Sequence, residues 1–268
     1  MNRSRITHSH KQVGIRMRIL LTNDDGIYAK GIEVLHRALS AIHEVIVVAP
    51  ETERSAVGHA ITFLNPLRVK PVHRNGIFFG YAVDGYPADC VKLALAELIK
   101  PAPDIVVSGI NLGSNLGVNV IYSGTVSAAT EASVLGIPSV AVSIDAFEKP
   151  RFDSAARVML DLLPLVEEHG LPDGVSLNVN VPNIPPEELR GMRVTRQGKL
   201  KYMERYDRRV DPRNHEYYWL CSSNPVTEAD PEADFEAVAQ NCASVTPIQY
   251  DLTCYSMMEE LGKWAFPK

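Results

Sequence analysis

Two adjacent carboxylates, Asp24 and Asp25, follow a short apolar segment near the start of the chain. Like charges at this spacing repel, so such a pair needs either a cation between the side chains or a proton on one of them. One aspartate alone can cap the N-terminus of the helix that follows. Because a second aspartate would then only add repulsion, the pattern favours an oxygen-lined site for a divalent cation over a helix cap.

Two further loops carry neutral oxygen donors that suit the same cation. Ser55 follows the apolar segment 44–50, and Asn111 lies in the glycine-rich sequence SGINLGSNLG. Each residue taken alone is more typical of loop hydrogen bonding than of metal binding. Together with two carboxylates they would leave Mg²⁺ or Mn²⁺ with net positive charge and with open positions for a phosphate oxygen and a water.

A fourth loop offers groups that suit a phosphate. Ser123, Gly124 and Thr125 precede a pattern of small residues that predicts a helix. Ser123 or Thr125 alone fits a helix cap, whereas a helix N-terminus at this place would favour an anion. His59, a loop histidine of the kind that usually lies on the surface, is a candidate for an acid or phosphate contact. Asn23, beside the aspartates, is a second auxiliary candidate.

Alternating strand and helix patterns must position these loops. Apolar strand segments alternate with helical patterns, which predicts an α/β fold with a doubly wound, mostly parallel sheet. Ligands of such sheets bind outside the carboxyl ends of the strands, where the candidate residues fall. The predicted strands are 18–22, 44–50, 103–110, 137–144 and 174–182, with a hairpin of 60–72 and 77–85, and the predicted helices are 31–42, 87–99, 124–136 and 151–170.

The pattern changes after residue 186, so we divide the chain into residues 1–16, 17–186 and 187–268. The first part is polar and basic, lacks the apolar centre of a secretory signal, and predicts a disordered extension. In the last part, the basic and aromatic stretch 193–220 predicts a hairpin that stands off the main body. A helix at 232–242, a strand at 244–253 and a short helix from residue 256 are predicted after it.

Overall composition limits the classes of partner. The net charge of −5 over 268 residues argues against a nucleic-acid polymer as partner. No apolar run approaches the length of a membrane span, which argues against a membrane partner. Four cysteines without a C-x-x-C pair predict reduced thiols and a cytoplasmic location.

Five ordered motifs carry a resemblance to a known family. The segments MRILLTNDDGI, VVAPETERSAVGH, GYPADCVKLAL, VSGINLGSNLG and YSGTVSAATEASVLGIPSVAVS resemble the stationary-phase survival protein SurE family, from residue 17 to about residue 144 and more weakly beyond. The resemblance implies a Rossmann-like domain with a protruding hairpin and a C-terminal oligomerisation segment exchanged between subunits in a homo-dimer or homo-tetramer. It further implies a 5′/3′-nucleotidase with one divalent metal ion per subunit, held by Asp24, Asp25, Ser55 and Asn111.

The resemblance leads to a hypothesis of direct hydrolysis. Nucleoside 5′- and 3′-monophosphates, and short-chain polyphosphate in some members, would be the substrates. Asp24 or Asp25 would accept a proton from the attacking water, and Ser123, Gly124 and Thr125 would hold phosphate oxygens. Two positions depart from the family pattern, namely Tyr86, where threonine is usual, and Ala132, where glycine is common. Neither belongs to the ligand set, but Tyr86 leaves the base preference open.

Three alternatives are weighed against this hypothesis. A phosphatase that forms an aspartyl-phosphate usually has D-x-D spacing, which the adjacent aspartates lack. A receiver-like signalling domain that binds Mg²⁺ needs an aspartate where Asn111 stands, and such a domain is about half this length. A protein that binds nucleotides without turnover is the third alternative, and an open metal site beside an anion cradle would then lack a purpose.

Overall fold

The structure, a computed structural model, describes residues 16–199, 204–222 and 230–267. The predicted disordered extension therefore lies outside the described residues, apart from Arg16. The elements along the chain are β1 (Arg18–Thr22), α1 (Lys30–Leu39), β2 (Glu44–Pro50), β3 (Val69–Arg74), β4 (Ile77–Val83), α2 (Pro87–Leu93), a π-helical segment (Ala94–Leu98), β5 (Ile105–Leu112), a 3-10 helix (Gly117–Ile121), α3 (Gly124–Val134), β6 (Ser139–Asp145), α4 (Phe152–His169), β7 (Val175–Pro182), a second 3-10 helix (Pro186–Glu188), β8 (Met192–Val194), β9 (Glu204–Val210), β10 (Glu216–Ser222), α5 (Asp234–Ala239), β11 (Ala243–Gln249) and α6 (Tyr255–Leu261).

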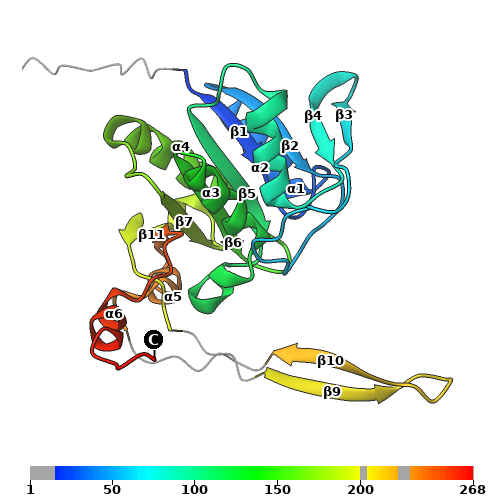
Figure 1. The fold of residues 1–268 in the computed structure, drawn as a ribbon. Coiled ribbons are helices and arrows are strands. Elements are labelled where there is room, and N and C mark those ends of the chain that lie inside the picture. The colour runs from blue at the N-terminus through cyan, green and yellow to red at the C-terminus, as the bar shows by residue number, and fades with distance from the viewer. Residues whose placement is uncertain (1–15, 200–203, 223–229, 268) are drawn as a thin grey trace, which may run out of the picture.

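A nine-stranded sheet forms the centre of the molecule (Figure 1). The strand order is β3-β4-β2-β1-β5-β6-β7-β11-β8, and the pairs from β4 to β7 are parallel. The hairpin strand β3 is antiparallel to β4, and β11 is antiparallel to β7. The strand order proceeds from β1 to β2 on one side and to β5 on the other. Because these three strands are parallel, their carboxyl ends lie at one edge of the sheet, which is the place for a ligand in this topology.

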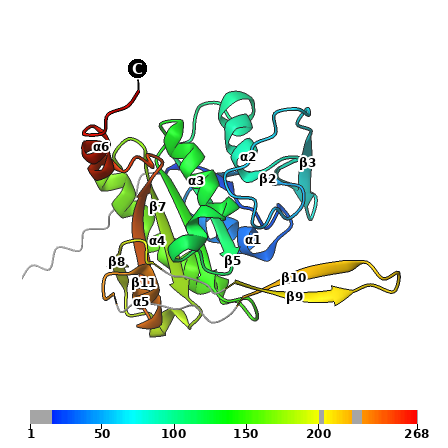
Figure 2. The same cartoon turned by 60° about the horizontal axis from the view of Figure 1, so that its bottom comes forward.

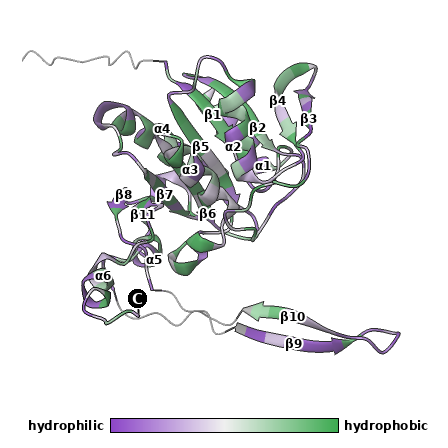
Figure 3. Cartoon of the chain, viewed as in Figure 1, coloured by the Kyte–Doolittle hydropathy of each residue, from purple (hydrophilic) through white to green (hydrophobic). Residues whose placement is uncertain are grey.

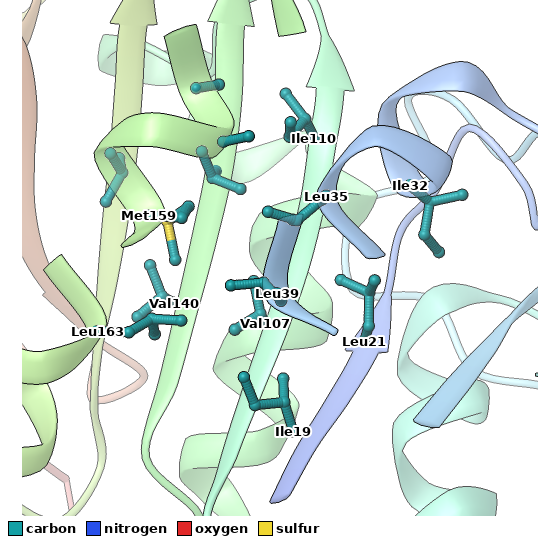
Figure 4. Packing of buried hydrophobic residues seen from close by; sticks show 14 of the residues in the cluster. Ile19, Leu21, Ile32, Leu35, Leu39, Val107, Ile110, Val140, Met159 and Leu163 are labelled. Carbon is teal, nitrogen blue, oxygen red and sulfur yellow. The ribbon is translucent and has the colours of Figure 1, made fainter. Parts of the chain in front are cut away.

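Both faces of the sheet are covered by helices, which explains why its central strands β1, β2 and β5 are rich in apolar residues. Ile19 and Leu21 of β1 belong to one core with α1 and α4, and Leu20 between them belongs to a second core with α2 and α3. Figure 4 shows the first core, in which Leu35 and Leu39 lie beside the sheet. The prediction of a doubly wound, mostly parallel α/β sheet is confirmed.

A two-stranded antiparallel hairpin, β9 with β10, projects from the body (Figures 1 and 2). The strand β10 is the more hydrophobic of the two (Figure 3). The predicted protruding hairpin is therefore confirmed, but its predicted start was wrong. Residues 192–194 form β8, which joins the edge of the central sheet by parallel pairing with β11, so the hairpin strands begin only at residue 204.

Other predicted boundaries need correction. The predicted strand 60–72 begins only at residue 69, because Pro66 interrupts the segment and Thr62 donates its N–H to Asp89 rather than to a strand. The predicted helix 87–99 changes at residue 94 to a π-helical segment, and it ends at residue 98, three positions before Pro101. The helix predicted at 232–242 spans only 234–239, and the strand predicted at 244–253 ends at residue 249.

Candidate active site

The two aspartates lie in a tight turn at the carboxyl end of β1. Asn23 Nδ2 donates to the Gly26 carbonyl at 2.9 Å and so closes the turn. The loop after β2 is fixed against this turn, because the Arg54 N–H donates to the Asp24 carbonyl at 2.8 Å. Backbone hydrogen bonds therefore place the aspartate turn and the Ser55 loop side by side, as the sheet topology predicts.

Asp24 is buried and is held by the first turn of α3. One carboxylate oxygen accepts the Thr125 N–H at 3.0 Å, and the other accepts the Thr125 hydroxyl. Burial raises the pKa of Asp24, and the bonds from Thr125 partly offset that rise. This contact fixes the orientation of Asp24 and commits the Thr125 hydroxyl to the carboxylate.

Asp25 is half-buried and has weaker support. Its Oδ2 accepts the Leu112 N–H at 3.2 Å. Burial, followed by the negative charge of Asp24 and a smaller effect of Glu53, raises the pKa of Asp25 to about 7. This edge of the sheet, the rim, therefore disfavours the charged form of both aspartates, and a cation bound between them would favour it.

The two neutral candidates lie at the same rim but have other partners. Asn111 stands just after a register shift in β5, and its Nδ2 donates to the Gly113 carbonyl at 2.6 Å, which leaves its Oδ1 as the oxygen for a ligand. Ser55 is exposed and donates its hydroxyl to Glu53 at 2.6 Å. Glu53 lies close enough to raise the pKa of both aspartates, so Ser55 is near the pair through this neighbour.

The donor set agrees with a hard divalent cation. Two carboxylates with an amide and a hydroxyl oxygen match the ligand preference of Mg²⁺ or Mn²⁺. In the described ranges of the chain, no group of three or more His, Cys, Asp or Glu side chains is arranged for a metal. A cation at this rim would therefore rely on neutral oxygens to complete its shell.

The residues predicted to hold phosphate form the N-terminus of α3. Ser123 caps the helix, because its Oγ accepts the Val126 N–H at 3.1 Å. Gly124 lies against Asp24, and a Cβ at this position would stand 2.8 Å from the Asp24 Cβ. The N–H and the hydroxyl of Thr125 both donate to Asp24, so neither points toward the place predicted for a phosphate. The missed contact between Thr125 and Asp24 has one sequence signal, the small residues that let this helix end approach the aspartates.

His59 contacts a glutamate of α3. Its Nε2 is 2.7 Å from the Glu131 carboxylate, which also accepts Lys92 Nζ at 2.9 Å. Glu131 is buried, and the hydrogen bond from His59, followed by that from Lys92, lowers its pKa. The contact ties the Ser55 loop to α3. Glu131 was missed from the sequence, although a lone acidic residue among the small residues of a helix was a possible signal.

Replacing Glu131 with Gln is expected to destabilise the protein by about 1–3 kcal/mol, because the amide has one acceptor oxygen and no charge, so one of the two charge-assisted hydrogen bonds is lost and the other is weakened. Urea unfolding of Glu131→Gln against wild type measures the change. Glu97→Gln is the control, since Glu97 is an acidic residue outside this network. Equal stability of Glu131→Gln and wild type would show that the network does not anchor the loop.

The pKa of Asp25 predicts how metal binding depends on pH. Between its ordinary pKa of 3.8 and about 7, the folded protein holds a proton that the unfolded chain has released, so metal-free stability falls as pH rises through this window. A cation competes with that proton. Added Mn²⁺ should therefore raise the melting temperature much more at about pH 8 than at about pH 5, as thermal unfolding would measure. An equal rise at both values would contradict the assignment.

The fold and the rim together define a Rossmann-like α/β protein whose ligand edge carries an acidic pair, an asparagine and a helix N-terminus. The family model described as Survival protein SurE matches residues 19–204. The chain belongs to the SurE family.

Relatives and a solved structure agree with this assignment. The 5′-nucleotidase SurE of Syntrophobacter fumaroxidans is 64% identical over 92% of this chain and 99% of its own length. The 5′-nucleotidase SurE of Syntrophus aciditrophicus is 48% identical over 91% and 92%. The crystal structure of the SurE protein from Aquifex aeolicus is 42% identical, covers 91% of this chain and 98% of its own, and has a TM-score of 0.81.

Proposed function

We propose that this protein is a metal-dependent nucleotidase that hydrolyses nucleoside 5′-monophosphates, and also 3′-monophosphates, to nucleoside and phosphate. The observation that carries the proposal is the pair Asp24 and Asp25 at the ligand edge of the sheet, where Asp24 contacts the first turn of α3. Relatives named 5′-nucleotidase SurE, alike over nearly their whole length, support a phosphoric monoester hydrolase. Short-chain polyphosphate is a further substrate in this proposal.

One divalent ion per subunit, Mg²⁺ or Mn²⁺, would be held by Asp24, Asp25, Ser55 and Asn111. When bound, it supplies positive charge that polarises the phosphate ester and favours deprotonation of water. Asn111 offers its free Oδ1, and Ser55 would turn its hydroxyl away from Glu53.

The chain's own residues position and orient the reacting groups. Thr125 holds Asp24 in one orientation through two hydrogen bonds, so this carboxylate is fixed before the substrate arrives. Leu112 donates to only one carboxylate oxygen of Asp25, which leaves the other oxygen available. Asp25 is therefore better placed than Asp24 to accept a proton from water. The N-terminus of α3, with Ser123 and Gly124, supplies a favourable dipole for the phosphate.

The rival mechanisms fit the geometry less well. In an aspartyl-phosphate mechanism one carboxylate must attack, yet both oxygens of Asp24 are engaged by Thr125 and Asp25 faces the repulsion of Asp24. A receiver-like domain needs a carboxylate after the strand that here ends with Asn111 and Leu112. Both observations favour direct hydrolysis.

A panel of nucleoside 5′- and 3′-monophosphates, with short-chain polyphosphate, tests the proposal when each substrate is assayed with Mg²⁺, with Mn²⁺ and with chelator. Released phosphate should appear with at least one ion and disappear with chelator. Turnover that is equal with and without chelator would remove the metal from the proposal, and no turnover under any condition would remove the nucleotidase.

The assembly that we propose is a homo-dimer or homo-tetramer in the cytoplasm. Free thiols at all four cysteines support the location, and the structure has no helix, among its described residues, that could span a bilayer. Large exposed apolar side chains on the hairpin and the C-terminal segment support the assembly, and they include Tyr206, Tyr218, Trp219, Leu220, Leu252, Tyr255, Met258, Trp264 and Phe266. Sedimentation of wild type and of a Trp219→Ser variant tests it.

A further inference from the structure

The segment 112–122 connects two parts of the candidate site, because Asn111 precedes it and Ser123 follows it. Its first half is anchored to the sheet by buried asparagines. The Asn115 N–H donates to Asn180 Oδ1 at 2.7 Å, and the Asn115 carbonyl accepts from Asn178 Nδ2 at 2.8 Å. Both partners belong to β7, so the strand fixes this half of the segment.

The second half is held at Gly117 by residues that are distant in the sequence. The Gly117 N–H donates to Asp234 Oδ2 at 2.9 Å, and the Gly117 carbonyl accepts from Gln197 Nε2 at 2.9 Å. Both backbone polar groups of one residue in the site segment are thus bound by side chains more than 75 residues later in the chain. Gly117 has a φ of +54°, a conformation that glycine adopts readily and most other residues do not, so a side chain at this position would strain the segment.

Asp234 also joins the two ends of the hairpin insertion. Its Oδ1 accepts the Gly198 N–H at 3.1 Å and its own neighbour's N–H, from Phe235, at 2.9 Å. Residue 198 comes before the hairpin and residue 234 after it, so one fully buried carboxylate binds the start of the insertion, its end and the site segment. Gly198 has no room for a side chain, because a Cβ would stand 2.4 Å from the Phe235 ring.

Apolar packing supports the same connection. Leu116 of the site segment packs with Val238 and Phe235 of α5, in a small cluster apart from the two main cores. Gly117 is therefore held by two hydrogen bonds, one to Asp234 and one from Gln197, beside the apolar contact of Leu116. Three backbone N–H groups fix the orientation of the buried Asp234 carboxylate. The carboxylate in turn restricts the positions of the three backbone groups that it binds.

We propose that Asp234 and Gln197 are positioning residues of the nucleotidase site, which set Asn111 and the N-terminus of α3 relative to Asp24 and Asp25 by holding Gly117. The inference rests on the proposed function for its effect on turnover. Under this proposal, the geometry of the site depends on the segments before and after the hairpin. A shift of these segments would move Gly117 and so alter metal binding at Asn111.

Two variants test the proposal by different chemistry. Asp234→Asn replaces one acceptor oxygen with an NH₂ group, which opposes one of the three N–H groups that Asp234 binds. Gln197→Met keeps the length of the side chain but removes the donor to the Gly117 carbonyl. Loss of supporting contacts to a metal site typically costs about 10–100-fold in metal affinity or activity, and we expect changes of this size in both variants.

Each variant is measured in three ways, and its kinetics are measured at a temperature well below its unfolding transition. The Mn²⁺ concentration that half-saturates the metal-free protein is read from thermal unfolding, kcat and KM are read with AMP, and stability is read from urea unfolding. Asp230→Asn is the matched control, because Asp230 pairs with Arg196 beside the same segment but does not bond Gly117. We expect weaker Mn²⁺ binding and lower kcat in both variants and wild-type values in the control.

The outcomes separate positioning from simple stability. Lower stability with unchanged Mn²⁺ binding and kcat would overturn the proposal, and so would equal losses in Asp230→Asn. If Asp234→Asn does not fold, Gln197→Met decides alone, because it removes a single hydrogen bond. If the wild type hydrolyses no nucleotide, the proposed function fails, but the Mn²⁺ measurements still test whether these residues position the site.

Discussion

Asp25→Asn is expected to lower the turnover of AMP and of p-nitrophenyl phosphate by about 10²–10³-fold while the metal-free protein stays folded. The loss corresponds to several kcal/mol of transition-state stabilisation by a correctly held cation. The metal-free variant should be at least as stable as wild type at about pH 8, because burial and Asp24 disfavour the charge at this position. Asparagine can still accept the Leu112 N–H, so the turn keeps its hydrogen bond.

Asp145→Asn is the matched control for this variant. Asp145 ends β6 at the same edge of the sheet, but it is exposed and accepts the Ser114 hydroxyl instead of joining the aspartate pair. Its replacement should leave turnover within about twofold of wild type, as expected of a surface position outside the site. Near-normal turnover in Asp25→Asn, or an equal loss in both variants, would contradict the assignment of Asp25.

Gly124→Ala is expected to have the second largest effect. Alanine is the better residue for a helix in general, so propensity alone would predict a small gain in stability. Here an added Cβ would stand 2.8 Å from the Asp24 Cβ and 3.0 Å from its Oδ2. Asp24 or the start of α3 must shift, which should cost about 1–3 kcal/mol in stability and about 10–100-fold in kcat.

Gly262→Ala provides the comparison, because this glycine directly follows α6 and a Cβ there would meet no atom closer than 3.4 Å. It should show neither loss. Kinetics with AMP and urea unfolding of both variants measure the effects. Unchanged kcat in Gly124→Ala would show that the close approach of α3 to Asp24 does not matter for the reaction.

The central strands and the position of the candidate site could be predicted from sequence because both follow from local patterns. Each strand of the parallel sheet is buried on two faces, so β1 and β5 are recognisable as short apolar runs. The polar residues after such runs then gather at one edge by topology alone. This reasoning brought Asp24, Asp25 and Asn111 to one rim without any knowledge of side-chain contacts.

Contacts between distant segments could not be predicted in this way. The hydrogen bonds of Thr125 to Asp24 and of Gly117 to Asp234 join residues that are more than 100 positions apart. The local periodicity of apolar residues carries no information about such contacts. The short strand β8 was missed because three residues carry too little pattern to separate an edge strand from a hairpin. The partner of His59 is a residue on a helix, and only the packing of that helix brings Glu131 to the loop.

The most direct measurement is anomalous diffraction from a crystal of this protein soaked in Mn²⁺. A single strong peak bounded by oxygens of Asp24, Asp25, Ser55 and Asn111 is the predicted result, with the Ser55 hydroxyl turned away from Glu53. No peak at that rim in a well-diffracting crystal, while phosphate release continues unchanged in EDTA, would contradict the proposal that a divalent cation compensates these carboxylates and binds the ester.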